Sequence, residues 1–207
     1  MKQNAKITVA IASLILAVIV FFVTKMVSER KFEENLDRFT LHAFTLAYSA
    51  NLIANEYTAI WERHIRMHRN QFRFASSDFS EWTEVNFDRT GWPFGDFINA
   101  VNQRKTEWES RGGTMERALE HGDTARQILK EIDKSWFGSR GGKRFAEELY
   151  SNALDYYLFA RNGPTGSLRS FNGRKNELSS NITRSFRNLA PYSSMAWAAQ
   201  AKWQADF

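Results

Sequence analysis

The sequence predicts an all-α protein, in which an N-terminal single transmembrane helix leads into an irregular helical bundle with a long central helix. Three observations predict this class. The chain has an uncharged stretch of eighteen residues near its start, no Gly or Pro before Gly91, and apolar residues spaced by threes and fours along most of its length. Such spacing places side chains on one face of a helix.

Residues 7–27 are interpreted as a retained membrane anchor behind a short basic tail at residues 1–6. The uncharged core, "ITVAIASLILAVIVFFVT", would reach roughly 27 Å as a helix, close to the ~30 Å hydrocarbon core of a bilayer. A secretory signal normally has a shorter apolar region of ~7–15 residues and a small-x-small cleavage site, and the sequence offers no such site here. A removed signal peptide, which would leave the chain free in solution, is the alternative.

The orientation of this anchor rests on charge. The tail carries Lys2 and Lys6 and no acid, whereas basic and acidic residues are mixed after the apolar run. Counting Lys and Arg alone slightly favours the second flank in the cytoplasm, but a first helix with a basic tail usually keeps its N-terminus inside. We therefore expect a single-pass membrane protein with a cytoplasmic N-terminus and an extracytoplasmic main domain. The chain has no cysteine and can form no disulfide, so its composition does not indicate the redox compartment.

Residues 28–207 form the predicted helical bundle domain, with a central helix at 28–73. Stepping by fours and threes from Phe32 gives nine apolar or aromatic positions in succession, the seam expected of a bundle helix. These positions are Phe32, Leu36, Phe39, Ala43, Leu46, Ala50, Ile53, Tyr57 and Ile60. A second apolar row lies beside the seam, which favours a helix wrapped by others over a simple dimer. This row is Leu41, Phe44, Tyr48 and Leu52.

The rest of the domain is predicted as a loop followed by shorter helices. Residues 74–95 are interpreted as an aromatic-rich ordered loop, in which positions 83, 85 and 87 alternate as in a short strand. The helices that follow have apolar residues at 98–108, 115–119, 128–136, 145–160, 178–189 and 197–203. Thr114 is the expected N-cap of the helix at 115–119, and Gly122 is expected to interrupt that helix. "GSRGG" is expected to end the run at 128–136. "NGPTG" is a strong stop because a glycine C-cap is followed by proline.

Two histidines are weak candidates for a cofactor site. His64 and His68 are four residues apart and so share a helix face, which can hold a transition metal. Two ligands are insufficient, and a third would have to be His42, His121 or a carboxylate. The His-Glu-x-x-His and Glu-x-x-His patterns are absent. We therefore expect no metal and no cofactor, with His64 as a polar residue that fixes register or bonds locally.

No catalytic residues are predicted. "GSRGGKR" at 138–144 fails the phosphate-loop spacing, because Phe137 stands where the first glycine should be and Arg144 replaces the hydroxyl residue. "SERK" at 28–31 matches a short pattern of penicillin-recognising enzymes, but its partner motifs are missing. A solvated helix face is the ordinary interpretation of the neighbouring carboxylates.

Arginine and tryptophan supply the candidate partner-binding residues. The candidates are Arg63, Arg66, Arg69, Arg73, Arg184, Arg187, Trp197 and Trp203. The first four form a basic stripe, and Arg63 would lie roughly 57 Å along the helix from Lys25, which favours a protein partner over the membrane. Residues 161–207 hold seven basic and two acidic residues, which accounts for the whole net charge of +5. Core packing is the alternative for one of the two tryptophans.

These observations favour a non-catalytic accessory or interaction subunit of a larger membrane or envelope complex. Trp, Phe and Arg are residue types enriched at interface hot spots. The expected contacts are protein partners and the lipid bilayer through 7–27, with no nucleic acid; a homo-oligomer also fits the seam. The alternatives are an extracytoplasmic ligand-binding or sensory domain and an envelope enzyme. No second membrane segment follows, so we do not expect the chain to pass a signal inward by itself.

Overall fold

The computed structural model describes the backbone of residues 2–72 and 94–206, and the side chains of residues 13–66 and 97–206. Within these residues the chain forms six helices and no strand, which confirms the all-α class. The helices are α1 (Lys2–Phe72), α3 (Phe94–Glu109), α4 (Thr114–Lys134), α5 (Arg140–Asn162), α6 (Leu168–Leu189) and α7 (Ser194–Asp206). The predicted loop and strand at 74–95 lie outside the described residues, except that residues 94 and 95 begin α3.

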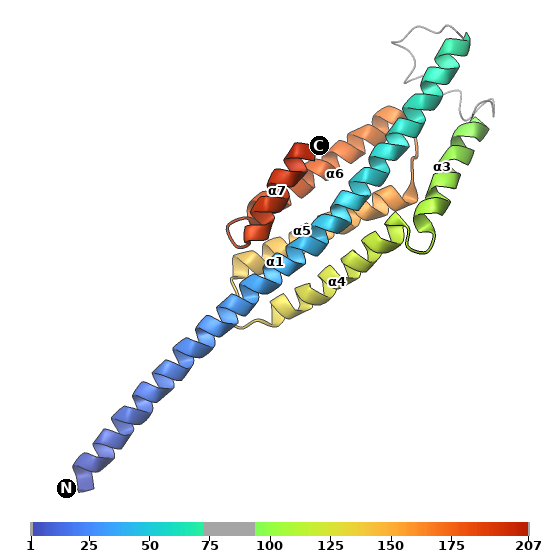
Figure 1. The fold of residues 1–207 in the computed structure, drawn as a ribbon. Coiled ribbons are helices and arrows are strands. Elements are labelled where there is room, and N and C mark those ends of the chain that lie inside the picture. Colours follow the sequence, from blue (N-terminus) through green and yellow to red (C-terminus); the bar gives the residue numbers. More distant parts are fainter. Residues whose placement is uncertain (1, 73–93, 207) are drawn as a thin grey trace.

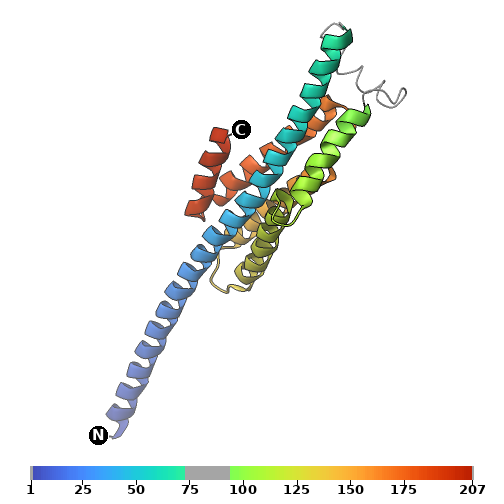
Figure 2. The same cartoon turned by 45° about the vertical axis from the view of Figure 1, so that its right-hand side comes forward.

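Helix α1 is the long central helix of the bundle. It contacts each of the other five described helices. Figures 1 and 2 show these helices gathered around its C-terminal part, while its N-terminal part projects alone. The helix is continuous because residues 2–72 contain neither Gly nor Pro, the two residues least compatible with a helix interior.

The predicted seam is buried along its whole length. All nine positions from Phe32 to Ile60 have exposed fractions of 6% or less, and seven of them are at 0% or 1%. The second row is correct only in part, because Leu41 and Leu52 remain 47% and 46% exposed. The helices that cover α1 therefore leave one face of it open to solvent at these two positions.

No helix among the described residues is long and apolar enough to cross a membrane. The side chains of residues 7–12, which belong to the predicted anchor, lie outside the described part of the chain. The anchor at 7–27 thus receives no support from this finding and stays a prediction.

Two predicted helix boundaries are wrong, and close contacts explain each. Thr114 is the first residue of α4 and not its cap; Gly113 holds the cap position, where a side chain would collide with the Trp108 carbonyl. Gly122 does not interrupt α4. It is buried, and a Cβ there would lie 3.3 Å from Leu46 of α1, so the glycine lets the two helices approach.

The "GSRGG" segment does separate two helices, because α4 ends at Lys134, and its last three residues already belong to α5. Ser139 is the N-cap of α5, and its side chain accepts a hydrogen bond from the Gly142 backbone at 3.3 Å. Gly142 packs close to Phe32 and Leu36 of α1. At the other end of α5 the prediction is confirmed, because Gly163 ends the helix with φ +80°.

A carboxylate of α1 holds the start of helix α7. Asp37 of α1 accepts hydrogen bonds from the Ser193 hydroxyl at 2.6 Å, the Ser194 hydroxyl at 2.9 Å and the Met195 backbone at 3.1 Å. Burial raises the pKa of Asp37, but these hydrogen bonds outweigh it and leave the pKa below its ordinary value. A residue of α1 therefore caps the first turn of the last helix.

Candidate functional site

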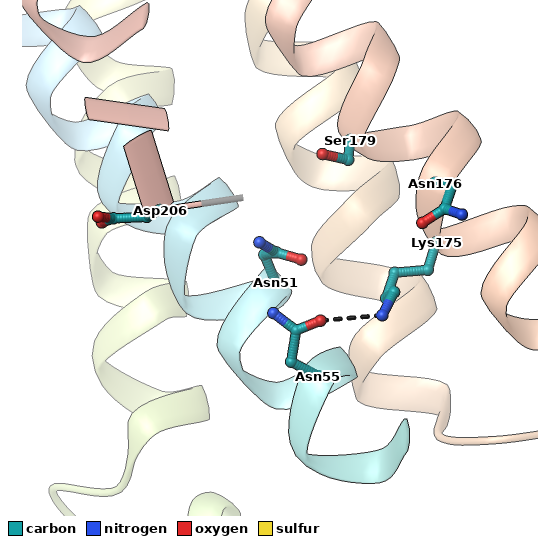
Figure 3. A pocket seen from close by; sticks show the side chains of 6 residues that line it. All are labelled: Asn51, Asn55, Lys175, Asn176, Ser179 and Asp206. Atoms are coloured by element: carbon teal, nitrogen blue, oxygen red, sulfur yellow. Dashed lines mark hydrogen bonds between the residues drawn. The ribbon is translucent and has the colours of Figure 1, made fainter. Parts of the chain in front are cut away.

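A polar cavity of about 230 Å³ opens between α1, α6 and α7. It is lined by Asn51, Asn55, Lys175, Asn176, Ser179 and Asp206. Figure 3 shows the two asparagines of α1 facing the lysine of α6. Hydrogen-bonding groups from three helices meet at this point, although none of these six residues was among the sequence-based candidates.

Lys175 supplies a cation to this cavity. Its ammonium donates to Asn55 Oδ1 at 2.9 Å and lies 3.5 Å from Thr58 Oγ1. Burial lowers the pKa of Lys175, and the charge of Glu62 partly opposes this. No carboxylate forms an ion pair with Lys175 in the described part of the chain. A half-buried ammonium thus has amide and hydroxyl partners but no counter-ion among the described side chains.

Asn51 supplies a buried donor beside the lysine. Its side chain is 3% exposed, and its Oδ1 accepts a short hydrogen bond from the Tyr156 hydroxyl. Its Nδ2 finds no partner among the described residues. An unsatisfied buried amide is unfavourable unless water or a ligand satisfies it. Lys175 and Asn51 together present donors suited to an anionic oxygen.

Asp206 at the other side of the cavity is already engaged. It accepts from the Tyr48 hydroxyl at 3.1 Å and lies 2.9 Å from the Lys202 ammonium. Neither a hydroxyl nucleophile activated by a base nor a pair of facing carboxylates lines the cavity. The arrangement can therefore bind a small polar molecule.

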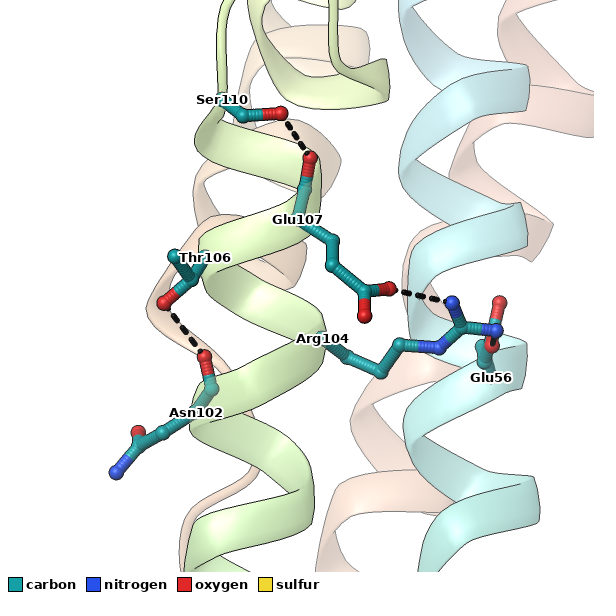
Figure 4. Close-up of polar contacts among 6 residues, drawn as sticks. All are labelled: Glu56, Asn102, Arg104, Thr106, Glu107 and Ser110. Atoms are coloured by element: carbon teal, nitrogen blue, oxygen red, sulfur yellow. Dashed lines mark hydrogen bonds and ion pairs between the residues drawn. The ribbon is translucent and has the colours of Figure 1, made fainter.

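A second, larger groove of about 480 Å³ lies between α1 and α3. Arg104 of α3 bridges it to Glu56 of α1 and is also 2.6 Å from Glu107 (Figure 4). Arg63 lines the same groove, so two arginines balance two glutamates. These ion pairs are substantially exposed and contribute little to stability. The charges of these lining residues therefore neutralise one another.

The predicted histidine site is not assembled by the residues described. His64 Nδ1 donates to the Ile60 carbonyl at 2.8 Å, and its ring packs edge-on against Phe97. This is the local bonding that the sequence offered as the alternative to a metal. The side chain of His68 lies outside the described residues. No group of three metal-ligating side chains occurs among those described.

Two other histidines form a pair that sequence reasoning did not predict. His42 of α1 and His121 of α4 approach with their Nδ1 atoms 2.8 Å apart. Burial lowers the pKa of His42, and the nearby charges of His121 and Arg38 lower it further. At this distance one ring donates and the other accepts, so at least one of them is neutral. No local sequence signal connects residues separated by 79 positions.

The structure separates the predicted partner-binding residues into different surroundings. Arg63 and Arg66 are exposed, and Arg66 lies 3.7 Å from Glu62. Arg184 and Arg187 are exposed on α6, beside buried Phe186. The side chains of Arg69 and Arg73 lie outside the described residues.

The two tryptophans of α7 differ in solvent exposure. Trp197 is 69% exposed, whereas Trp203 is 2% exposed and packs near Phe44, Tyr156 and Phe186. The alternative of core packing is therefore correct for Trp203. Of these two tryptophans, Trp197 is the one available to a partner surface.

No protein-family model, no curated protein and no solved structure matches this chain. The fold and the cavity must therefore carry any functional argument by their own chemistry.

Proposed function

We propose that this chain is a non-catalytic helical protein that is anchored in a membrane by residues 7–27. The supporting observation is the apolar surface at the start of α1. Eleven large apolar side chains between Leu14 and Val27 are each 47–68% exposed, on a helix segment that projects from the bundle and is contacted at Phe21 by Phe137. A continuous apolar surface of this kind is unfavourable in water and favourable in lipid.

The anchor is tested by placing charge within it. Replacing both Ile15 and Ile19 by Arg should move the protein from the membrane fraction to the soluble fraction, because each Arg near the bilayer centre costs about 2.5–3.5 kcal/mol on insertion scales. The matched control is Leu119→Arg, a similar change at an exposed position of α4. A wild-type protein that is extracted by alkaline carbonate would reject the anchor.

The proposal includes an extracytoplasmic bundle, which rests on the basic tail with Lys2 and Lys6. Protease added to spheroplasts should digest the bundle while residues 1–6 stay protected. Intact-mass measurement should find the N-terminal residues still present. Full protection of the bundle in intact spheroplasts would reverse the orientation.

The bundle is proposed to bind a protein partner through Trp197 and the exposed arginines of α6. Exposed Trp and Arg are the side chains most often found at interface hot spots. Copurification in mild detergent followed by mass spectrometry should recover the partner with wild-type protein and lose it with Trp197→Ala. Leu158→Ala, a change at another exposed apolar position, should retain it. Equal recovery with both variants would remove Trp197 from the interface.

A second candidate function is binding of a small organic carboxylate in the cavity beside Lys175. It is favoured by the half-buried ammonium and by the Asn51 amide, which find neither a counter-ion nor a hydrogen-bond acceptor, respectively, within the described part of the chain. The cavity of about 230 Å³ is smaller than sites for drug-sized ligands, which favours a ligand of few atoms.

A panel of acetate, glycolate and glycine tests this candidate. A ligand that binds the folded state raises the thermal midpoint of the wild-type protein. The shift should be lost in Lys175→Met and kept in Lys134→Met, a change of an exposed lysine outside the cavity. No shift with any of the three compounds, or an equal shift in Lys175→Met, would exclude such a carboxylate site.

A further inference from the structure

The loop between α4 and α5, residues 135–139, holds the most exposed large apolar side chain described. Trp136 is 90% exposed, whereas Trp61, Trp108 and Trp203 are buried. An indole exposed to solvent at the tip of a loop does not stabilise the bundle. The residues around Trp136 indicate which partner would bury it.

Aromatic and glycine contacts fix this loop against α1. The ring of Phe137 packs edge-on against Phe21, with ring centroids 5.9 Å apart. Gly138 lies so close to Phe32 that a Cβ would be 2.5 Å from its ring, which requires a glycine there. Trp136 is therefore held beside α1 by its two following residues.

The contact with Phe21 places the loop along the axis of α1. Phe21 belongs to the uncharged run at 7–24, four residues before Lys25. Four residues correspond to roughly 6 Å along a helix. The ring of Phe137 thus lies beside the end of the apolar segment, whereas the next residue, Gly138, lies against Phe32, seven residues after Lys25. The loop that carries Trp136 therefore spans the level where charged residues begin.

The charges around the loop complete the pattern. Residues 131–144 contain four basic residues and two acidic ones, a net charge of +2. Lys134 and Arg140 are exposed and form no ion pair within the described part of the chain. Lys143 donates to the carbonyls of Asp133 and Ser135, each at 2.7 Å, and so holds the end of α4 against the loop.

We propose that loop 135–139 is a second membrane contact, in which Trp136 inserts into the headgroup region of the bilayer crossed by α1. Trp is favoured at that depth because its ring is apolar and its N–H is polar. Lys134 and Arg140 then face anionic headgroups. The inference rests on the proposed anchor at 7–27 and adds that the bundle is held at a fixed height and orientation against the membrane surface.

Spin labels at single cysteines test this contact in the full chain, which has no cysteine of its own. The variants are Trp136→Cys, Ile19→Cys and Trp197→Cys. Each would be reconstituted into vesicles of phosphatidylcholine and phosphatidylglycerol, and its accessibility to oxygen and to a water-soluble nickel complex measured. Trp197 is the matched control, because it is exposed but follows a segment attached at Asp37, roughly 24 Å along α1 from Phe21.

The label at 136 should be several-fold less accessible to nickel than the label at 197, and more accessible to oxygen. If the label at 19 is shielded but the label at 136 is as accessible to nickel as that at 197, the loop does not touch the bilayer, and Trp136 is left for a protein partner. If the label at 19 is itself accessible to the nickel complex, the proposed anchor at 7–27 is wrong instead. Circular dichroism checks that each variant keeps its helices.

Discussion

Helix α1 has two parts that are equally helical but differ in what surrounds them. From Leu14 to Val27 the apolar side chains point in every direction and remain exposed. From Phe32 to Ile60 they follow a seam and are buried by the other helices. A periodic row of apolar residues can be buried by other helices on one side. A helix that is apolar on all faces needs an apolar environment on every side. Periodic spacing, and not apolar content alone, therefore identifies the face of a helix that other helices of the same chain bury.

The largest expected difference between the two parts concerns stability. Phe39→Ala should lower the free energy of unfolding by about 3–5 kcal/mol, because it removes a fully buried ring and leaves a cavity. Ile19→Ala should change it by less than about 0.5 kcal/mol, as exposed positions do. Chemical denaturation in detergent, followed by circular dichroism, measures both. Similar small effects at the two positions would mean that the seam is not buried.

The next test extends the comparison to the helix that covers the seam. Trp203→Ala should cost about 3–5 kcal/mol, since Trp203 lies 2% exposed among aromatic rings of α1, α5 and α6. Trp197→Ala, six residues earlier on the same helix, should leave the thermal midpoint nearly unchanged. If neither variant is destabilised, α7 is not part of the core.

A smaller effect is expected where α7 is attached to α1. Asp37→Asn should cost about 1 kcal/mol, the usual loss for a helix cap. The pKa of Asp37 is lowered by folding, so its stabilisation is present above its ordinary pKa of 3.8 and is lost as pH falls through the lowered value. Acid unfolding curves of the two proteins should therefore converge at low pH. Parallel curves would show that the carboxylate charge is not involved.

The smallest effect concerns the His42–His121 contact between α1 and α4. The pKa of His42 is lowered from 6.5 by burial and by its neighbours. Folding therefore favours its neutral form, so this contribution is present above pH 6.5 and is lost as pH falls through the lowered value. His121→Gln should raise the pKa of His42 in an NMR titration, because one of its causes is removed. An unchanged pKa would mean that the two rings do not interact.

Much of the fold was predictable because it depends on local pattern. The nine-position seam, the stop at Gly163 and the alanine-rich last helix follow from spacing and from residues with strong backbone preferences. The errors at Thr114 and Gly122 have a common cause. Gly113 takes the cap position because a side chain there would collide with the Trp108 carbonyl, and Gly122 lets α4 approach Leu46 of α1 without ending the helix. Sequence patterns do not distinguish these two uses of glycine.

The sequence by itself determined the helical class, the buried face of α1 and the uncharged segment before it. Only the tertiary structure decided which distant polar groups meet. Lys175 lies 120 residues from Asn55, and Asp37 caps a helix that begins 157 residues later. Such contacts leave no local signal in the sequence, because they depend on how the helices pack against one another. That packing is driven by burial of the apolar faces, and the positions of the polar groups follow from it. The position of Trp136 beside the end of the apolar segment has the same origin.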